Sequence, residues 1–183
     1  MTSSLERFDL QSSIESIDKT EFKGLWANKL WPNTPGPFYG ADTDSCGTGP
    51  IKAPYNSGLD FNSFEYIFKQ PSTLQELNEV INAAAVNVLS GYACDGDAHW
   101  TISLIQDWWK RRHELLRLCL SSQYLASELA DSPETTIRIY RRNARFRIQY
   151  VRTELAGYLA RYSFFVEEGR MPRETDTIPL YSW

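Results

Sequence analysis

The sequence has few of the residues that most often carry catalysis or cross-links. It holds two histidines and three cysteines among 183 residues, and Cys46, Cys94 and Cys119 lie far apart. No Gly-x-Ser-x-Gly elbow, phosphate-binding loop or dinucleotide fingerprint is present. These absences give no support to a standard hydrolase, nucleotide-binding protein or disulfide scaffold. They favour free thiols in a reducing compartment.

Long hydrophobic runs are also missing. The longest, Ala83–Val86, is far shorter than the roughly 20 residues that a membrane-spanning helix needs. The first ten residues lack a basic segment followed by an apolar one, so we expect no signal peptide. We therefore expect a cytoplasmic protein that makes no membrane contact.

Charge is distributed unevenly along the chain. The net charge is −4, with 6 Lys+Arg against 14 Asp+Glu in residues 1–107 (6 − 14 = −8) and 13 against 9 in residues 108–183 (13 − 9 = +4). Such polarity favours an oriented encounter with a charged partner. The alternative is that the acidic half folds against the basic half.

The length and the 42% hydrophobic content fit a single domain over residues 1–183. Residues 1–70 are expected to form an irregular wrap, because prolines and glycines between Gly24 and Asn62 forbid long helices while aromatic residues make a floppy linker improbable on composition. A strand is expected over Phe61–Lys69.

Residues 71–183 carry the helical patterns. Ser72 or Thr73 is expected to cap a helix that ends near Gly91, and Thr101 to cap a second one. The expected buried face of the first helix consists of Leu74, Leu77, Ile81, Ala84 and Val88.

A longer helical pattern starts at Pro133 and continues to Phe165. Gly169 is its expected C-cap, and Gly157 is the expected place for a break. The tail, residues 171–183, ends on apolar residues and is expected to dock on the domain. The predicted fold class is thus mostly α, with three or four helices, an ordered Pro/Gly-rich N-terminal wrap and a small β element.

Two segments share an unusual composition. Residues 35–50 and 91–100 each place an aromatic residue after glycine and set two aspartates two positions apart beside a cysteine. The first fails as a calcium loop because Ala53 stands at position twelve, where a glutamate is needed. Turn formation and helix capping explain these residues without a ligand, so we expect no metal and no cofactor.

These two segments nonetheless predict a candidate binding surface, provided that they pack together. Its residues are Tyr39, Asp42, Asp44, Cys46, Asp95, Asp97, His99 and Trp100.

Several motifs resemble an uncharacterised family of small bacterial proteins that is frequent in actinomycetes. They include Gly-Pro-Phe-Tyr-Gly-Ala-Asp-Thr-Asp-Ser-Cys at 36–46, Gly-Tyr-Ala-Cys-Asp-Gly-Asp-Ala-His-Trp-Thr at 91–101 and Phe-Phe-Val-Glu-Glu-Gly at 164–169. The resemblance spans about residues 24–180 and implies no particular activity. Some relatives carry a ferredoxin label. The iron–sulfur cluster of a ferredoxin needs four cysteine ligands at characteristic spacing, and this chain has three scattered cysteines.

We favour a protein-binding module, an immunity-type protein that neutralises a toxin by occluding it. The acidic first half would suit a basic partner. The alternative is a small enzyme or metal-dependent ligand-binding protein that uses Asp42, Asp44, Asp97 and His99 as a carboxylate and histidine pocket. Arginines along residues 138–152 could follow phosphates, but the net acidity argues against nucleic-acid binding.

Overall fold

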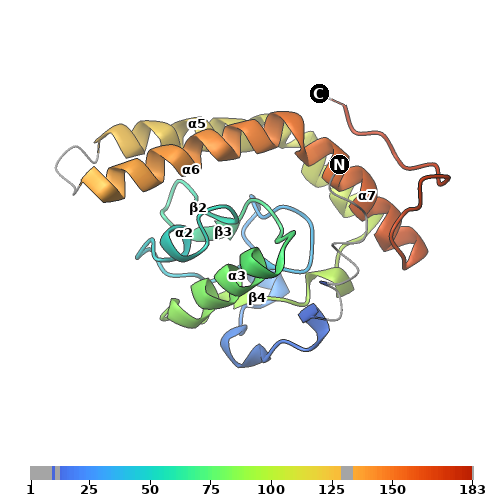
Figure 1. Cartoon of the computed structure of the whole chain (residues 1–183), viewed down its shortest axis with the longest axis horizontal. Helices are drawn as coiled ribbons and strands as arrows, with labels where there is room; N and C mark the ends of the chain where they lie inside the picture. Colours follow the sequence, from blue (N-terminus) through green and yellow to red (C-terminus); the bar gives the residue numbers. More distant parts are fainter. Residues whose placement is uncertain (1–9, 11–12, 129–133, 183) are drawn as a thin grey trace.

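A computed structural model describes residues 10, 13–128 and 134–182 of the chain. This part is mostly α-helical with two small antiparallel sheets of two strands each, which confirms the predicted fold class. Helices α5 (Arg112–Glu128) and α6 (Glu134–Thr153) lie side by side above the wrap and the sheets, and α7 (Leu155–Glu168) continues from α6 at one end (Figure 1). Within the described residues, no helix is long and apolar enough to cross a membrane.

Helix α3 (Leu74–Val86) begins as predicted, with the Thr73 hydroxyl accepting a hydrogen bond from the Glu76 amide. It ends before the expected Gly91, because Asn87 leaves the helical conformation and its side chain binds the Gly91 amide. The buried face also differs from the predicted one: Leu74 and Val88 are exposed. The residues of α3 that are buried are Leu77, Val80, Ala83 and Ala84.

Helix α4 (Ile102–Lys110) starts at the predicted Thr101 cap, whose hydroxyl accepts from the Leu104 amide. It is separated from α5 by Arg111 alone. Both tryptophans of α4, Trp108 and Trp109, face the protein and are buried.

The long helical pattern is interrupted between Thr153 and Leu155 rather than at Gly157, which lies inside α7. The Thr153 hydroxyl donates to the Gln149 carbonyl four residues earlier, and such back-bonding bends helices. Gly169 is the predicted C-cap, with a left-handed φ of 67°. The expected start at Pro133 lies outside the described residues.

The β element consists of four very short strands. Strand β1 (Tyr39–Gly40) pairs with β4 (Tyr92–Ala93), and β2 (Ser57–Leu59) pairs with β3 (Glu65–Ile67). The strand expected over Phe61–Lys69 is shorter because the Asp60 carboxylate accepts the amides of Asn62 and Phe64, which holds a turn there. The remaining short helices are η1 (Lys19–Glu21), η2 (Trp26–Asn28), α2 (Gly49–Lys52) and η3 (Gly96–Ala98).

The wrap is ordered mainly by buried side chains that bind its backbone. The Asn33 amide donates to the carbonyls of Leu30 and Gly40, both at 2.7 Å. Its Oδ1 accepts from the amides of Gly40 and Ile67 at 2.8 and 2.9 Å. One side chain therefore joins the wrap, β1 and β3.

Gln70 performs a second bridging role. Its Oε1 accepts from the Phe38 amide, and its Nε2 donates to the carbonyls of Thr34 and Phe38. Gly36 leaves room for this side chain, since a Cβ there would lie 2.4 Å from Gln70 Cγ. The wrap is thus held against the core by specific hydrogen bonds from buried side chains.

Two principal apolar clusters fill the interior. We call residues 13–100, which hold the wrap, both sheets and α3, the base. The larger cluster joins Tyr66 and Phe68 of the base to α4, α5, α6 and α7, and the second lies between α3, Phe38, Ile67 and Tyr92. The tail docks as predicted: the hydroxyls of Tyr181 and Ser163 lie 2.7 Å apart.

Replacing Asn33 with Ala should destabilise the fold by about 3 kcal/mol, because the buried amides of Gly40 and Ile67 lose their acceptor. Chemical unfolding followed by circular dichroism would measure this loss. Asn82→Ala, at an exposed position of α3, is the control and should change the free energy of unfolding little. An equal effect of both variants would contradict this role of Asn33.

Candidate functional site

The two aspartate-containing segments pack against each other. Tyr39 faces Ala93 and Gly40 faces Tyr92 in the β1–β4 pair. The pairing continues on both sides, where the Ala41 amide donates to the Gly91 carbonyl and the Gly96 amide to the Pro37 carbonyl. Residues that are far apart in the sequence therefore lie on one continuous part of the base.

The first segment places its acidic groups in separate surroundings. Asp42 is exposed and accepts a hydrogen bond from Asn28 Nδ2 at 2.5 Å. Asp44 is buried and accepts from the amides of Cys46 and Val88 at 2.8 and 3.0 Å. Asp44 thus holds the turn at Cys46 and the end of α3 together, which is a structural task.

Cys46 is exposed on this turn, and all three cysteines of the chain are free thiols. A hydrogen bond to Asp44, followed by the charge of that carboxylate, raises the pKa of the Cys46 thiol above its usual value. The thiolate is the nucleophile and the metal ligand. The Asp44 carboxylate therefore works against both chemistries at this cysteine.

The second segment brings three predicted residues into contact. The Tyr39 hydroxyl donates to Asp95 Oδ1 at 2.8 Å, and His99 Nε2 lies 3.3 Å from Asp95 Oδ2. Burial, and then the hydrogen bond to Asp95, raise the pKa of Tyr39 above its usual range. The phenol therefore stays protonated and serves as a donor that orients Asp95.

Asp97 and Trp100 turn toward the helices. Asp97 Oδ1 accepts from the Tyr162 hydroxyl of α7 at 2.7 Å, so this carboxylate connects η3 to the helical layer. Trp100 is 5% exposed, and its indole Nε1 is buried without a hydrogen-bond partner among the described residues. Of the eight predicted residues, Tyr39, Asp95 and His99 are thus joined directly to one another.

The sequence analysis did not include Trp26 and Lys29 in the candidate surface, although the structure places both at its centre. The Trp26 ring stacks on His99 at 4.8 Å and meets Tyr39 and Trp100 edge to face at 5.4 and 5.1 Å. Lys29, which directly follows η2, lies over the rings of Trp26 and Trp100, with its Nζ 5.1 and 4.7 Å from the ring centres. The three-residue spacing of Trp26 and Lys29 was the signal in the sequence that both could lie on one side of a helical turn. Because η2 has three residues, no longer periodic pattern supported that interpretation.

We call Trp26, Lys29, Tyr39, Asp95, His99 and Trp100 the Trp26 cluster. A neighbouring pair extends it: the Arg111 guanidinium lies 4.0 Å from the centre of the Trp31 ring. Trp31 is fixed in turn, because Trp108 Nε1 donates to its carbonyl at 2.9 Å. Aromatic faces and cations therefore alternate across this part of the molecule.

Opposing influences act on the Lys29 ammonium. Burial, and then the nearby charge of Arg111, lower the pKa of Lys29 to about 8. The two indole faces favour the charged form. The Lys29 ammonium forms neither a hydrogen bond nor an ion pair with another residue of the described chain.

Beneath the two segments lies a buried carboxylate that the sequence did not single out. Glu65 is 0% exposed and accepts from the Gly49 amide at 2.7 Å, the Tyr92 hydroxyl at 3.0 Å and the Asn87 amide at 3.2 Å. Burial raises the pKa of Glu65, while all three of these hydrogen bonds act in the opposite direction. Glu65 therefore joins α2, α3 and β4 from the inside.

The geometry supplies recognition more readily than catalysis. Asp42, Asp44 and Asp97 bind different partners in different directions, and His99 is engaged by Asp95. In the part of the chain that is described, no group of three or more His, Cys, Asp or Glu side chains could hold a metal ion. The chain matches no family model, no curated protein and no solved structure, so the resemblance to the actinomycete family stays an expectation.

Lys29 should titrate near pH 8 in an NMR titration of the ¹³C-labelled lysine side chains, with Lys29→Arg identifying its signal. Because the folded-state pKa lies below the ordinary 10.5, the unfolded chain binds more protons between these values. The contribution of Lys29 to stability should therefore rise as the pH increases from about 8 to 10.5.

Arg111→Gln should raise this pKa only in part, since burial is the larger cause of the shift. Full return to the ordinary lysine value in Arg111→Gln would show that the burial of the ammonium has little effect.

Proposed function

We propose that this chain is a protein-binding module that acts in the cytoplasm, and that Trp26, Lys29, Asp95 and His99 of the Trp26 cluster form its contact surface together with Trp31 and Arg111. Tyr39 and Trp100 are buried and support this surface from within. The specific role that we propose is that of an immunity-type protein, which occludes a toxin. The observation that carries the proposal is the meeting of half-buried Trp26, Lys29 and His99 on one rigid base.

The residue types of this surface are those that contribute most to protein interfaces. Tryptophan and arginine, the types of Trp26, Trp31 and Arg111, are enriched among residues whose truncation weakens binding strongly. Trp26 is held on one face by His99 and at its edges by Tyr39 and Trp100. Little side-chain entropy would be lost when a partner covers a ring that is already fixed.

The charges around the cluster bear on the partner. Of the 14 acidic residues in residues 1–107, Asp44, Asp60 and Glu65 are buried and cannot meet a partner. Asp42 and Asp95 remain exposed beside the cluster. Basic groups on a toxin would complement these two carboxylates, while acidic groups would complement Lys29 and Arg111.

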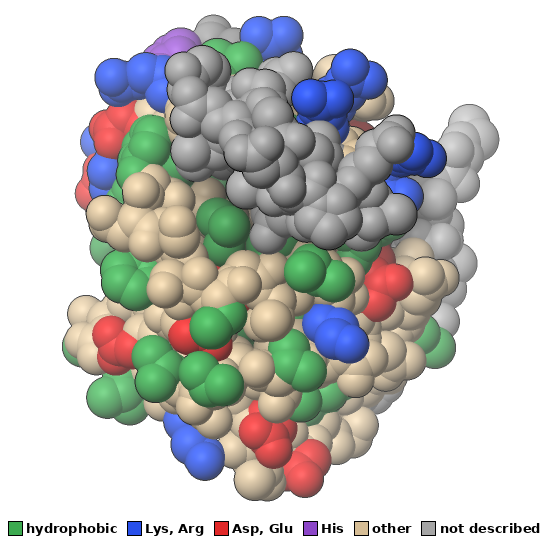
Figure 2. All heavy atoms as spheres, turned by 90° about the vertical axis from the view of Figure 1, so that its left-hand side faces the viewer, with side chains coloured by type: hydrophobic (Ala, Val, Ile, Leu, Met, Phe, Trp, Pro, Cys, Tyr) green, Lys and Arg blue, Asp and Glu red, His purple; other side chains and the backbone are tan. Residues whose placement is uncertain are grey.

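The two signs of charge are also separated over the molecule. On the face shown in Figure 2, Lys and Arg gather toward the end where α5 and α6 lie, and Asp and Glu occur mainly over the base. The base would therefore orient toward the basic side of an approaching protein.

The enzyme alternative has less support from the contacts. Its four residues, Asp42, Asp44, Asp97 and His99, would need to face one substrate. Asp44 and Asp97 are occupied by the Val88 amide and the Tyr162 hydroxyl. These hydrogen bonds give Asp44 and Asp97 a structural role without any substrate.

The test is co-purification of the tagged chain with the product of a neighbouring toxin gene, followed by calorimetric titration of variants. Trp26→Ala should weaken binding about 30-fold, as expected for the loss of a central interface tryptophan worth about 2 kcal/mol. His99→Ala should also weaken it, because the stacked support of Trp26 is lost.

Leu25→Ala is the matched control, since Leu25 is 63% exposed next to Trp26 but lies outside the cluster. It should bind like the unmodified chain. Thermal unfolding of every variant would separate a lost contact from a lost fold. Absence of a stable partner would refute the proposal, and unchanged affinity of a folded Trp26→Ala variant would refute the assigned surface.

A further inference from the structure

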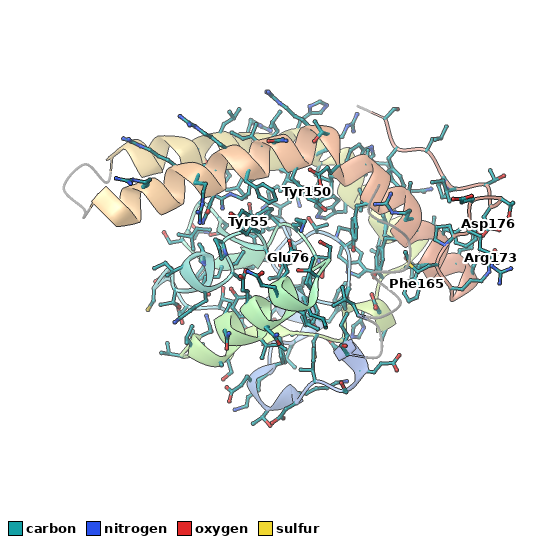
Figure 3. The ribbon with its side chains drawn as sticks, in the orientation of Figure 1. Tyr55, Glu76, Tyr150, Phe165, Arg173 and Asp176 are labelled. Atoms are coloured by element: carbon teal, nitrogen blue, oxygen red, sulfur yellow. The ribbon has the colours of Figure 1, made fainter. Side chains whose placement is uncertain are left out.

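A second group of residues with unused binding capacity lies on the other side of the base, beneath the helical layer. Arg147 of α6 is only 3% exposed, and α6 crosses above the β2–β3 pair at this point. Tyr55 and Tyr150, which Figure 3 labels, mark the same region between α6 and the base. Arg147 lies one turn before Tyr150 on the helix.

The Arg147 guanidinium is buried without the partners that such a group normally has. It forms neither a hydrogen bond nor an ion pair with any residue that the structure describes, and its Nε is fully buried and unpartnered. The guanidinium lies over the Phe68 ring, 5.6 Å from the ring centre. A guanidinium carries five N–H donors, and a buried charge without compensation is strongly unfavourable.

Two more buried polar groups accompany Arg147. The Asn143 Oδ1 has no hydrogen-bond partner among the described residues. The Tyr66 hydroxyl interacts with the thiol of Cys119, a weak acceptor, and binds no oxygen or nitrogen of the described residues. Asn143 is one helical turn before Arg147, and its Nδ2 is already used by the Pro50 carbonyl at 3.2 Å. The side of α6 that faces the base thus presents unsatisfied donors and an unsatisfied acceptor.

The position of Gly58 shows that Tyr66 and Arg147 meet. A Cβ at Gly58 would lie 2.3 Å from Arg147 Nη1 and 3.2 Å from the Tyr66 ring carbon Cζ, which bears the hydroxyl. The absent side chain of Gly58 therefore gives the guanidinium its place beside Tyr66. Burial, and then the neighbouring Cys119, raise the pKa of Tyr66 above its usual range, so its hydroxyl keeps the proton that it can donate.

A carboxylate of the base that could balance this charge, that of Asp60, already accepts other hydrogen bonds. Asp60, which acts electrostatically on Tyr66 together with Arg147, accepts the amides of Asn62 and Phe64. It forms no ion pair with Arg147 among the described side chains. The described residues therefore provide no carboxylate paired with Arg147.

We propose that Arg147, Tyr66 and Asn143 form a binding site for a small protonated oxyanion of the phosphate class, held between α6 and the β2–β3 pair. Oxygens of the anion accept from the guanidinium and the Tyr66 hydroxyl, and its own O–H donates to Asn143 Oδ1. Hydrogen phosphate carries both functions, whereas sulfate at neutral pH has acceptors only. The bound anion joins α6 to the base and so stabilises the folded chain.

Inorganic phosphate is the probe, added at constant ionic strength to the full chain during thermal unfolding and calorimetric titration. We expect a saturable rise in melting temperature that exceeds the effect of sulfate. A nucleoside monophosphate forms a second arm. Stronger binding of the nucleotide would identify a phosphate monoester as the ligand, and stronger binding of inorganic phosphate would identify the free ion.

Arg147→Met should abolish the saturable response, and without phosphate it should melt no lower than the unmodified chain, because an uncompensated charge has been removed. Arg145→Met, at an exposed position of the same helix, should respond like the unmodified chain. Tyr66→Phe removes one hydroxyl and should weaken phosphate binding about tenfold. It tests the site even if Arg147→Met does not fold.

The proposal is overturned if the unmodified chain shows no saturable response to phosphate. It is equally overturned if phosphate binds Arg147→Met or Tyr66→Phe as tightly as the unmodified chain. Since Trp26 is not involved, these results are independent of the partner-binding test.

Discussion

The hydrogen bonds of the buried Asn33 side chain are the constraint on which the base of this molecule depends. The wrap, β1 and β3 each provide only a few residues, too few for a ladder of backbone hydrogen bonds, yet their amides and carbonyls are buried. Buried backbone groups must find partners. The Asn33 side chain donates two hydrogen bonds and accepts two where these segments meet. The Gln70 side chain likewise both donates to and accepts from the backbone nearby.

This arrangement explains why the candidate surface can be rigid although it is built from loops. Trp26 belongs to η2, which is followed by Leu30, whose amide donates to the Gly40 carbonyl. His99 directly follows η3, which is joined to the wrap by the Gly96 amide. Both aromatic rings are therefore positioned by segments that the buried side chains have fixed. A surface on unsupported loops would have to be ordered by its partner at a cost in entropy.

Local signals in the sequence predicted the helical layer well. Thr73, Thr101 and Gly169 were recognisable because a cap depends on neighbours within four residues. The prediction of a break at Gly157 is wrong, because this glycine lies inside α7 and the helix is interrupted after Thr153, whose hydroxyl binds the Gln149 carbonyl. The buried face of α3 was shifted for a different reason: the predicted helix was too long, and Val88 belonged to the turn held by Asp44.

The likeness of the two aspartate segments hints at their pairing but does not determine it. Their contacts depend on Asn33, Glu65 and Gln70, whose hydrogen bonds reach across more than twenty positions of the chain, and such polar bridges leave no periodicity. Lys29 was not predicted for the same reason. Its ammonium lies over the Trp100 ring and is affected by the charge of Arg111, and both residues are distant in the sequence. Sequence patterns thus identified several residues of the site. The hydrogen bonds and charges that act on these residues come from parts of the chain that no sequence pattern links to them.

Two buried charges show how this chain treats such groups. Glu65 is enclosed by the Gly49 amide, the Tyr92 hydroxyl and the Asn87 side chain, so its burial is compensated from within the base. Arg147 has no such partners among the described residues, although the Tyr66 ring lies beside its guanidinium. The three hydrogen bonds to Glu65 show that a buried charge in this fold can be fully hydrogen-bonded by neighbouring residues. The unsatisfied state of Arg147, together with that of Asn143, is therefore better explained by a ligand than by imperfect packing.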